Sequence, residues 1–199
     1  MFLVYFVVNS SSMHTDIVLI GPVRTGKSTQ GRLLAENLGL PQVSLDLLRE
    51  QYYREIGFDP LLAKEIRQKG GFLALMFYRE LFAAYAVERF LADHHDCVID
   101  FGAGIYESDE MFARVQKALA DFSNVVLLLP SPDIDESLHI LAARDANPPA
   151  DLTFDLTARF LKHHTYYDLA RITVYTKGKT PEESCQEILE KVKGIRNHD

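Results

Sequence analysis

Cysteine is scarce in this sequence, and other organising signals are missing as well. Two cysteines, Cys97 and Cys185, have neither the number nor the spacing of a disulfide framework or a zinc site. We therefore expect both to be reduced thiols. We also find no internal repeat, low-complexity tract or interdomain linker. A chain of 199 residues has room for one ordinary domain, and these absences predict a single domain.

Positive charge is also in short supply. The chain has 21 lysines and arginines against 28 aspartates and glutamates, which gives a formal net charge of −7. A general nucleic-acid binder needs a concentration of basic residues to release counterions from the phosphate backbone. The composition therefore predicts no nucleic-acid partner, and any phosphate that binds must be held locally.

The two most apolar stretches of the chain lack the marks of a targeting signal or a membrane span. Residues 1–8, MFLVYFVV, are apolar but too short to span a bilayer, and they lack a basic leader and a small-residue cleavage site. The apolar stretch 72–91 contains charged residues, which disfavour a membrane span. We therefore expect a cytoplasmic protein with no membrane partner. We divide it into an extension of uncertain role, 1–15, and a domain over 16–199.

Short apolar strands alternate with helical segments along the whole chain. Strands are predicted at 16–20, 43–45, 97–100, 125–129 and 172–175. Helices are predicted from 28 to about 38, over 61–92 with a break at the glycines 70 and 71, at 108–121, 131–144 and 154–170, and from 181 onward. This alternation predicts an α/β fold: a three-layer α/β/α P-loop domain with a mostly parallel five-stranded sheet and a short lid.

The strongest motif is GPVRTGKS at 21–28, which matches GxxxxGK[ST] between a buried strand and a helix. Glycines allow backbone N–H groups to turn inward around phosphate, and the helix N-terminus adds positive charge. Lys27 would reach the β and γ phosphates, the Ser28 hydroxyl would bind Mg²⁺, and Thr29 would touch an inner phosphate. We therefore expect ATP and Mg²⁺ as cofactors. The predicted nucleotide-binding residues are Gly21, Pro22, Val23, Arg24, Thr25, Gly26, Lys27, Ser28 and Thr29.

Three charged residues near this motif have two interpretations each. Asp46 follows a strand at its carboxyl end, where α/β sheets place ligands, but it could simply cap a helix. Asp100 ends an apolar strand, where P-loop proteins hold the Mg²⁺ shell, but it could cap the following turn. Arg24 could approach a transferring phosphoryl group, although solvent exposure is the simpler interpretation for a loop arginine.

With these motifs in place, residues 15–194 resemble the shikimate kinase group of small P-loop kinases. GPVRTGKSTQGRLLAENLGLPQVSLD is similar to that family's opening, in which Asp46 falls on an aspartate associated with the acceptor hydroxyl. Ser44 stands where the family has a further aspartate. CVIDFGAG resembles the third strand and the glycine-rich substrate loop, so that Gly102 and Gly104 match two substrate-loop glycines.

The resemblance extends to the lid and the last helix. Arg144 is similar to the first lid arginine that closes over ATP, and DANPPADLT at 145–153 would be the lid. KHHTYYDLARITVYTKGKTPEE resembles the last helix, strand and adenine-side loop, and in that register a carboxylate-binding arginine becomes Lys162. Arg79 could replace the other substrate arginine, although its spacing from Asp46 is longer than in the family.

The resemblance implies an ATP-dependent kinase that acts on a hydroxyl of a small metabolite. Lys27, Ser28 and Arg144 would hold the charge of the transition state, with Asp100 as a further metal ligand. Asp46 would orient the acceptor hydroxyl and take its proton. The partner is then a small-molecule acceptor, and we expect a monomer or homodimer.

The departures from the family pattern fall mostly on the acceptor side, and they leave two alternatives open. One is a nucleotide-dependent regulatory ATPase or switch with a protein partner. The other is a nucleotide kinase, which the arginine-poor lid disfavours. No NKxD-type guanine signature is visible, which favours ATP over GTP.

Overall fold

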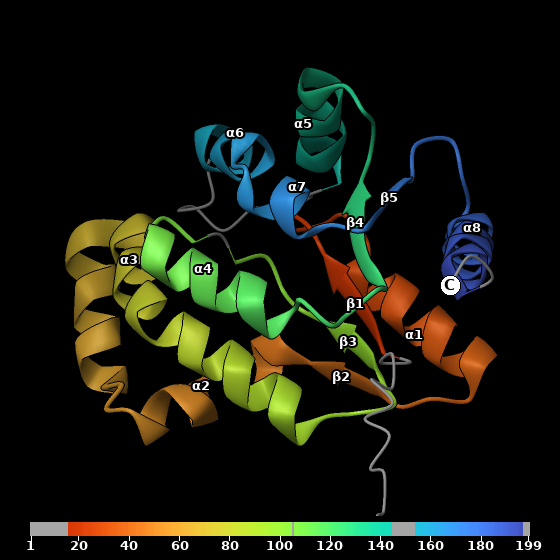
Figure 1. Ribbon diagram of the computed structural model, residues 1–199. Coiled ribbons are helices and arrows are strands. Elements are labelled where there is room, and N and C mark those ends of the chain that lie inside the picture. The colour runs from red at the N-terminus through yellow and green to blue at the C-terminus, as the bar shows by residue number, and fades with distance from the viewer. Residues whose placement is uncertain (1–15, 105, 145–153, 197–199) are drawn as a thin grey trace, which may run out of the picture.

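A computed structural model describes residues 16–104, 106–144 and 154–196 (Figure 1). The predicted extension at 1–15 and the predicted lid at 145–153 lie outside the described residues. The rest of the chain forms alternating strands and helices, as the sequence predicts.

Five parallel strands form one sheet. They are β1 (Ile17–Ile20), β2 (Gln42–Ser44), β3 (Val98–Asp100), β4 (Val125–Leu129) and β5 (Ile172–Tyr175). Their order is β2-β3-β1-β4-β5, which confirms the predicted parallel sheet. Strands β1 and β4 are buried along their whole length, as expected for central strands that are covered on both faces.

Eight helices are described around the sheet. They are α1 (Lys27–Leu38), α2 (Leu45–Glu55), α3 (Pro60–Asp93), α4 (Asp109–Ala118), α5 (Ile134–Ala143), α6 (Phe154–Lys162), α7 (Thr165–Leu169) and α8 (Pro181–Arg196). Helices α1 and α8 pack on one face of the sheet, where Leu34 and Ile188 join the same core cluster. Helices α3 and α4 lie on the opposite side of the sheet (Figure 1), where their apolar residues belong to a second, larger cluster. The predicted three-layer arrangement is therefore confirmed.

The long helix α3 is broken at Gly71, which adopts φ 72 and ψ −168, as the glycine pair predicts. By length and composition it is the one helix of the described residues that could cross a membrane, but it packs against α2 and α4. The stretch 72–91 is apolar on nearly every face, which predicts a buried helix, and this expectation is wrong for part of its surface. Phe90 is fully buried, whereas Leu73, Phe77 and Leu81 are exposed.

Two helix boundaries also differ from those predicted. The single helix expected at 154–170 is interrupted after Lys162, and the His163 ring lies 2.7 Å from the hydroxyl of Thr165 at the break. The helix predicted from residue 131 begins later, because Asp133 is the N-cap of α5 and accepts a first-turn backbone N–H. Ser131 accepts the backbone N–H of Asp133.

Candidate active site

The sheet order places the phosphate loop beside two other strand ends. Residue Leu19 of β1 is paired with Asp100 of β3, which is also paired with Ser44 of β2. The loops that follow these three strands therefore meet at the carboxyl edge of the sheet, where parallel α/β sheets bind ligands.

The phosphate loop has the backbone that its glycines predict. Gly21 has φ 137 and Gly26 has φ 99, and both values lie in the region that favours glycine. A Cβ atom on Gly21 would lie 2.6 Å from the carbonyl oxygen of Leu128, so a side chain is excluded there. Helix α1 starts directly after Gly26, and Ser28 and Thr29 in its first turn are exposed. The loop and the helix start thus offer inward N–H groups and two accessible hydroxyls to a phosphate.

Lys27 is folded back into this loop. Its Nζ donates hydrogen bonds to the carbonyl oxygens of Gly21 and Pro22, each at 2.8 Å. The side chain is buried, and this desolvation lowers the pKa of Lys27, while the nearby carboxylates of Asp100 and Asp46 act in the opposite direction. A desolvated ammonium at the centre of the loop is the charge that a phosphate chain would neutralise.

Asp100 connects the phosphate loop to the glycine loop after β3. One carboxylate oxygen accepts the hydroxyl of Ser28 at 2.6 Å, and the other accepts the backbone N–H of Gly102 at 3.1 Å. The capping interpretation of Asp100 is thus confirmed. Its other oxygen faces the hydroxyl that is predicted to bind Mg²⁺, and the metal role of Asp100 stays a prediction. A hydroxyl and a carboxylate are hard oxygen donors that fit Mg²⁺. No group of three or more His, Cys, Asp or Glu side chains that could hold a metal occurs in the described ranges.

Asp46 lies in the first turn of α2, next to the glycine loop. The N-cap position of α2 is occupied by Ser44, so the alternative that Asp46 caps this helix is wrong. Its carboxylate instead accepts a hydrogen bond from Nη1 of Arg49 at 2.6 Å. A Cβ atom on Gly102 would lie 2.4 Å from Oδ1 of Asp46, so this glycine lets the carboxylate rest directly on the backbone.

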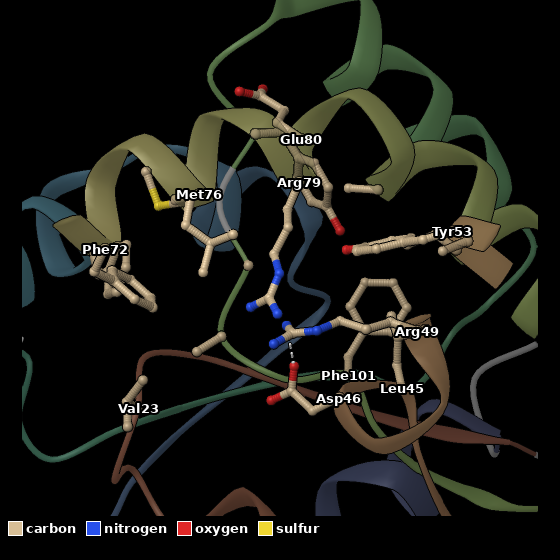
Figure 2. Close-up of a pocket in the computed structure, with 18 of the residues that line it drawn as sticks. Val23, Leu45, Asp46, Arg49, Tyr53, Phe72, Met76, Arg79, Glu80 and Phe101 are labelled. Atoms are coloured by element: carbon tan, nitrogen blue, oxygen red, sulfur yellow. Dashed lines mark hydrogen bonds and ion pairs between the residues drawn. The ribbon is translucent and has the colours of Figure 1, made fainter. Parts of the chain in front are cut away.

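A cavity of about 310 Å³ opens beside Asp46, between α2, α3 and the glycine loop (Figure 2). The predicted substrate residues Arg79 and Gly104 line it, together with Ala103 of the same loop. Apolar side chains from α3 and nearby segments form most of the remaining wall: Phe72, Leu75, Met76, Ala83, Val87, Phe101 and Phe160. Lys162, by contrast, is exposed and is not among the residues that line the cavity.

A second cavity of about 280 Å³ lies between the phosphate loop and the segment that follows β5. Arg144 crosses it, with Nη1 donating to the carbonyl oxygen of Arg24 at 3.1 Å and Nη2 to Thr176 Oγ1 at 3.4 Å. Arg24 itself is half-buried, not exposed as the simpler interpretation expects. Lys179, from the loop that the sequence assigns to the adenine side, completes this cavity. Four of the predicted nucleotide-binding residues also line this cavity: Arg24, Thr25, Gly26 and Thr29.

Sequence reasoning missed Arg49. Its guanidinium points into the larger cavity toward Arg79 and Asp46 (Figure 2). The signal that could have found it is the spacing, because residues three apart on a helix share a face and Arg49 follows Asp46 by three.

Comparison with known proteins decides the family. The family model for shikimate kinase matches residues 24–193, which is most of the chain. The chain belongs to the shikimate kinase family. It is therefore an ATP-dependent kinase that uses Mg²⁺ and transfers a phosphoryl group to a hydroxyl of a small metabolite. The regulatory switch and the nucleotide kinase are not favoured.

Relatives of this kinase cover nearly its full length. The shikimate kinase of Streptomyces coelicolor is 32% identical over 185 residues, which span 88% of this chain and 94% of the relative. That of Moorella thermoacetica is 31% identical over 188 residues, with 91% and 96% covered. The fold is similar to shikimate kinase from Acinetobacter baumannii in complex with shikimate, with a TM-score of 0.63 and 23% identity over 90% of this chain and 93% of that one.

Proposed function

We propose that this kinase phosphorylates a hydroxyl of a small ring carboxylic acid, with shikimate, the compound in its relatives' names, as the first candidate. The observation that carries the proposal is the position of Asp46. Its charge acts on Lys27 of the phosphate loop, and its side chain lines the arginine-containing cavity. A carboxylate between a phosphate site and an acceptor cavity suits the task of orienting a hydroxyl and taking its proton.

On the nucleotide side, Lys27 and Arg144 would stabilise the charge that spreads over the phosphate oxygens. Ser28 and Asp100 are the residues that would hold Mg²⁺, which when bound neutralises charge on the β and γ phosphates. The smaller cavity beside Arg144 would hold the nucleoside. The remaining predicted phosphate-loop residues, from Gly21 to Thr29, keep their proposed nucleotide-binding role.

On the acceptor side, Arg79 would bind the acid group, while Gly102 and Gly104 let the acceptor approach the backbone. Both Arg79 and Gly104 line the cavity. Lys162 is left out of this proposal because its exposed side chain does not line the cavity.

We further propose residues 16–199 as one catalytic domain, with 145–153 as its lid. The formal net charge of −7 supports a small-molecule partner over nucleic acid, and the packing of α3 within the domain argues against a membrane partner. We expect a cytoplasmic monomer or homodimer.

The test is ADP formation by the purified protein with Mg·ATP and a panel of hydroxylated metabolites that includes shikimate and nucleosides. We expect a ring acid to stimulate turnover. Asp46→Asn should lower kcat by about 10²-fold or more, the usual scale of general acid–base catalysis, without weakening ATP binding. Asp121→Asn, an exposed aspartate after α4, serves as the control. Stimulation by a nucleoside but by no ring acid would contradict the proposal.

A further inference from the structure

Two arginines from different helices face each other inside the larger cavity. The guanidinium of Arg49 comes from α2 and that of Arg79 from α3, and Figure 2 shows both pointing toward the centre of the cavity. Burial lowers the pKa of Arg79, and the charge of Arg49 lowers it further. Two like charges brought together in a partly buried site repel each other, and an anion between them would relieve that repulsion.

The existing contacts of these arginines leave hydrogen-bond donors for a ligand. Arg49 uses Nη1 to reach Asp46, and Arg79 uses Nη2 to reach Oε1 of Glu50 at 2.8 Å. A guanidinium carries five N–H donors. The Nε of Arg79 is buried and has no hydrogen-bond partner within the part of the chain that the structure describes. A buried donor without a partner is unfavourable, and an acceptor atom of a ligand would satisfy it.

Arg49 is also hydrogen-bonded to the carboxylate of Asp46, which the proposed reaction needs for the acceptor hydroxyl. Its bond to Oδ1 of Asp46 engages one oxygen, and the backbone of Gly102 lies against the same carboxylate. The ion pair is partly open to solvent, with 30% of the Arg49 side chain and 44% of the Asp46 side chain exposed. Exposed ion pairs contribute little to stability, so this bond is readily exchanged for another.

We propose that Arg49 is a positioning and specificity-determining residue. When the acceptor binds, Arg49 gives up its hydrogen bond to Asp46 and binds the acceptor's carboxylate together with Arg79. This inference rests on the proposed function of the site. The exchange frees Asp46 to receive the acceptor hydroxyl only when an acid group is present. With a neutral molecule, Arg49 stays hydrogen-bonded to Asp46. A ligand shifts the equilibrium between the bonded and the released Arg49 only if it binds one of these two states more tightly.

The chemistry of the cavity defines the acceptor further. Arginine binds a carboxylate through two parallel hydrogen bonds, and two arginines on different walls fix its orientation. The apolar side chains of Phe72, Leu75 and Phe101 surround the rest of the space. The acceptor is therefore an acid with one ring-sized body, a carboxylate at the arginine pair and a hydroxyl at Asp46.

The first experiment measures binding and does not depend on turnover. With Mg·ADP saturating the phosphate loop, calorimetry compares shikimate and 3-hydroxybenzoate with their methyl esters. We expect Arg49→Met to weaken binding of the acids by about tenfold to a hundredfold, as for loss of a charged hydrogen bond, and to leave the esters unchanged. Arg54→Met, an exposed arginine of the same helix, is the matched control and should change neither.

The second experiment compares kcat/KM for the acid and the ester of the best acceptor. The wild type should strongly prefer the acid. Arg49→Met should narrow this preference at least about tenfold, both because it loses the acid group's partner and because Asp46 is no longer held away from the ester. Arg49→Lys keeps the positive charge but cannot form two parallel hydrogen bonds, so its preference for the acid should lie between those of the wild type and Arg49→Met. Unchanged Mg·ADP affinity confirms that each variant is folded.

The outcomes separate this inference from the proposed function. If Arg49→Met weakens acid and ester equally, or if neither carboxylate binds the wild type, the role assigned to Arg49 is overturned. Turnover of a ring acid that does not depend on Arg49 leaves the kinase proposal intact. Arg49-dependent binding of a carboxylate without phosphoryl transfer would instead keep the arginine pair and overturn the proposed reaction.

Discussion

At position 102 the chain has no space for a side chain. The glycine has φ 76, and a Cβ atom would lie 2.4 Å from a carboxylate oxygen of Asp46. We expect Gly102→Ala to displace Asp46 and to lower kcat about tenfold or more, since small misplacement of a reacting group is costly. ATP affinity should not change.

The control for that substitution is Gly57→Ala. Gly57 has φ 93, but a Cβ atom there meets nothing within 4 Å. It therefore reproduces the backbone strain without the contact with Asp46. Steady-state kinetics of the two variants check the prediction, which is wrong if both lose the same activity.

His163 gives the stability of the fold a dependence on pH. Burial lowers the pKa of His163 below its ordinary value of 6.5, although Glu107 acts in the opposite direction. Between the lowered value and 6.5, the unfolded chain binds more protons than the folded one, so stability falls as the pH drops through this window. Well above 6.5 the ring is neutral in both states and has no such effect.

We therefore expect the free energy of unfolding to fall less for the His163→Gln variant than for the wild type when the pH is lowered from 7.5 to 5.5. Urea unfolding at the two pH values measures the difference, and the shared titration of carboxylates cancels in the comparison. Equal losses in both proteins would show that His163 does not cause the effect.

The sequence predicts single residues well where one local rule determines their role. The phosphate loop is contiguous, and Asp100 follows from its place at a strand end, so both could be found without the structure. The spacing could have placed Arg49 beside Asp46, but it could not show that α3 brings Arg79 to the same cavity. The substrate role of Lys162 depends on the family resemblance alone, and its side chain is exposed at the end of α6.

Among the elements, α8 begins with a capping box, for which Thr180 and Glu183 have the required spacing of three residues. The Thr180 hydroxyl accepts the backbone N–H of Glu183 at 3.1 Å, and the Glu183 carboxylate accepts that of Thr180 at 2.8 Å. Because α8 packs against α1, fraying here reaches the core behind the phosphate loop. We expect Thr180→Ala to lower the free energy of unfolding by about 1 kcal/mol, while Thr180→Ser retains it. Urea unfolding of the three proteins measures this, and an equal loss in both variants would contradict it.

The error about the burial of α3 concerns its neighbours and not its local preferences. The break of α3 at Gly71 follows from the glycine pair itself. Which face of α3 remains in solvent depends on how α2 and α4 pack against it, and the uniform apolar pattern carries no such information. The strand order likewise could not be derived residue by residue, because pairing of parallel strands is set by crossovers between distant segments.

For the molecule as a whole, nucleotide binding should stabilise the fold. A ligand that binds only the folded state at about 100 times its Kd adds about 2.7 kcal/mol, which for a chain of this size is a Tm increase of about 5–10 °C. We expect Mg·ATP to produce such a shift in the wild type and almost none in Lys27→Met, because Lys27 supplies the buried charge of the phosphate site.

Lys117→Met is the matched control, since Lys117 is an exposed lysine on α4. Thermal unfolding with and without Mg·ATP measures all three proteins. A full shift in Lys27→Met would contradict the assignment of Lys27.

The two oxygens of Asp100 connect the loop proposed to bind the nucleotide with the loop proposed to bind the acceptor. One oxygen bonds Ser28 at 2.6 Å in the phosphate loop, and the other bonds Gly102 at 3.1 Å beside Asp46. A rotation of this carboxylate therefore alters both loops together. If bound nucleotide changes the affinity for the acceptor by some factor, thermodynamic reciprocity requires that bound acceptor changes the affinity for the nucleotide by the same factor. The amount of one substrate that suffices to occupy the enzyme thus depends on how much of the other is present.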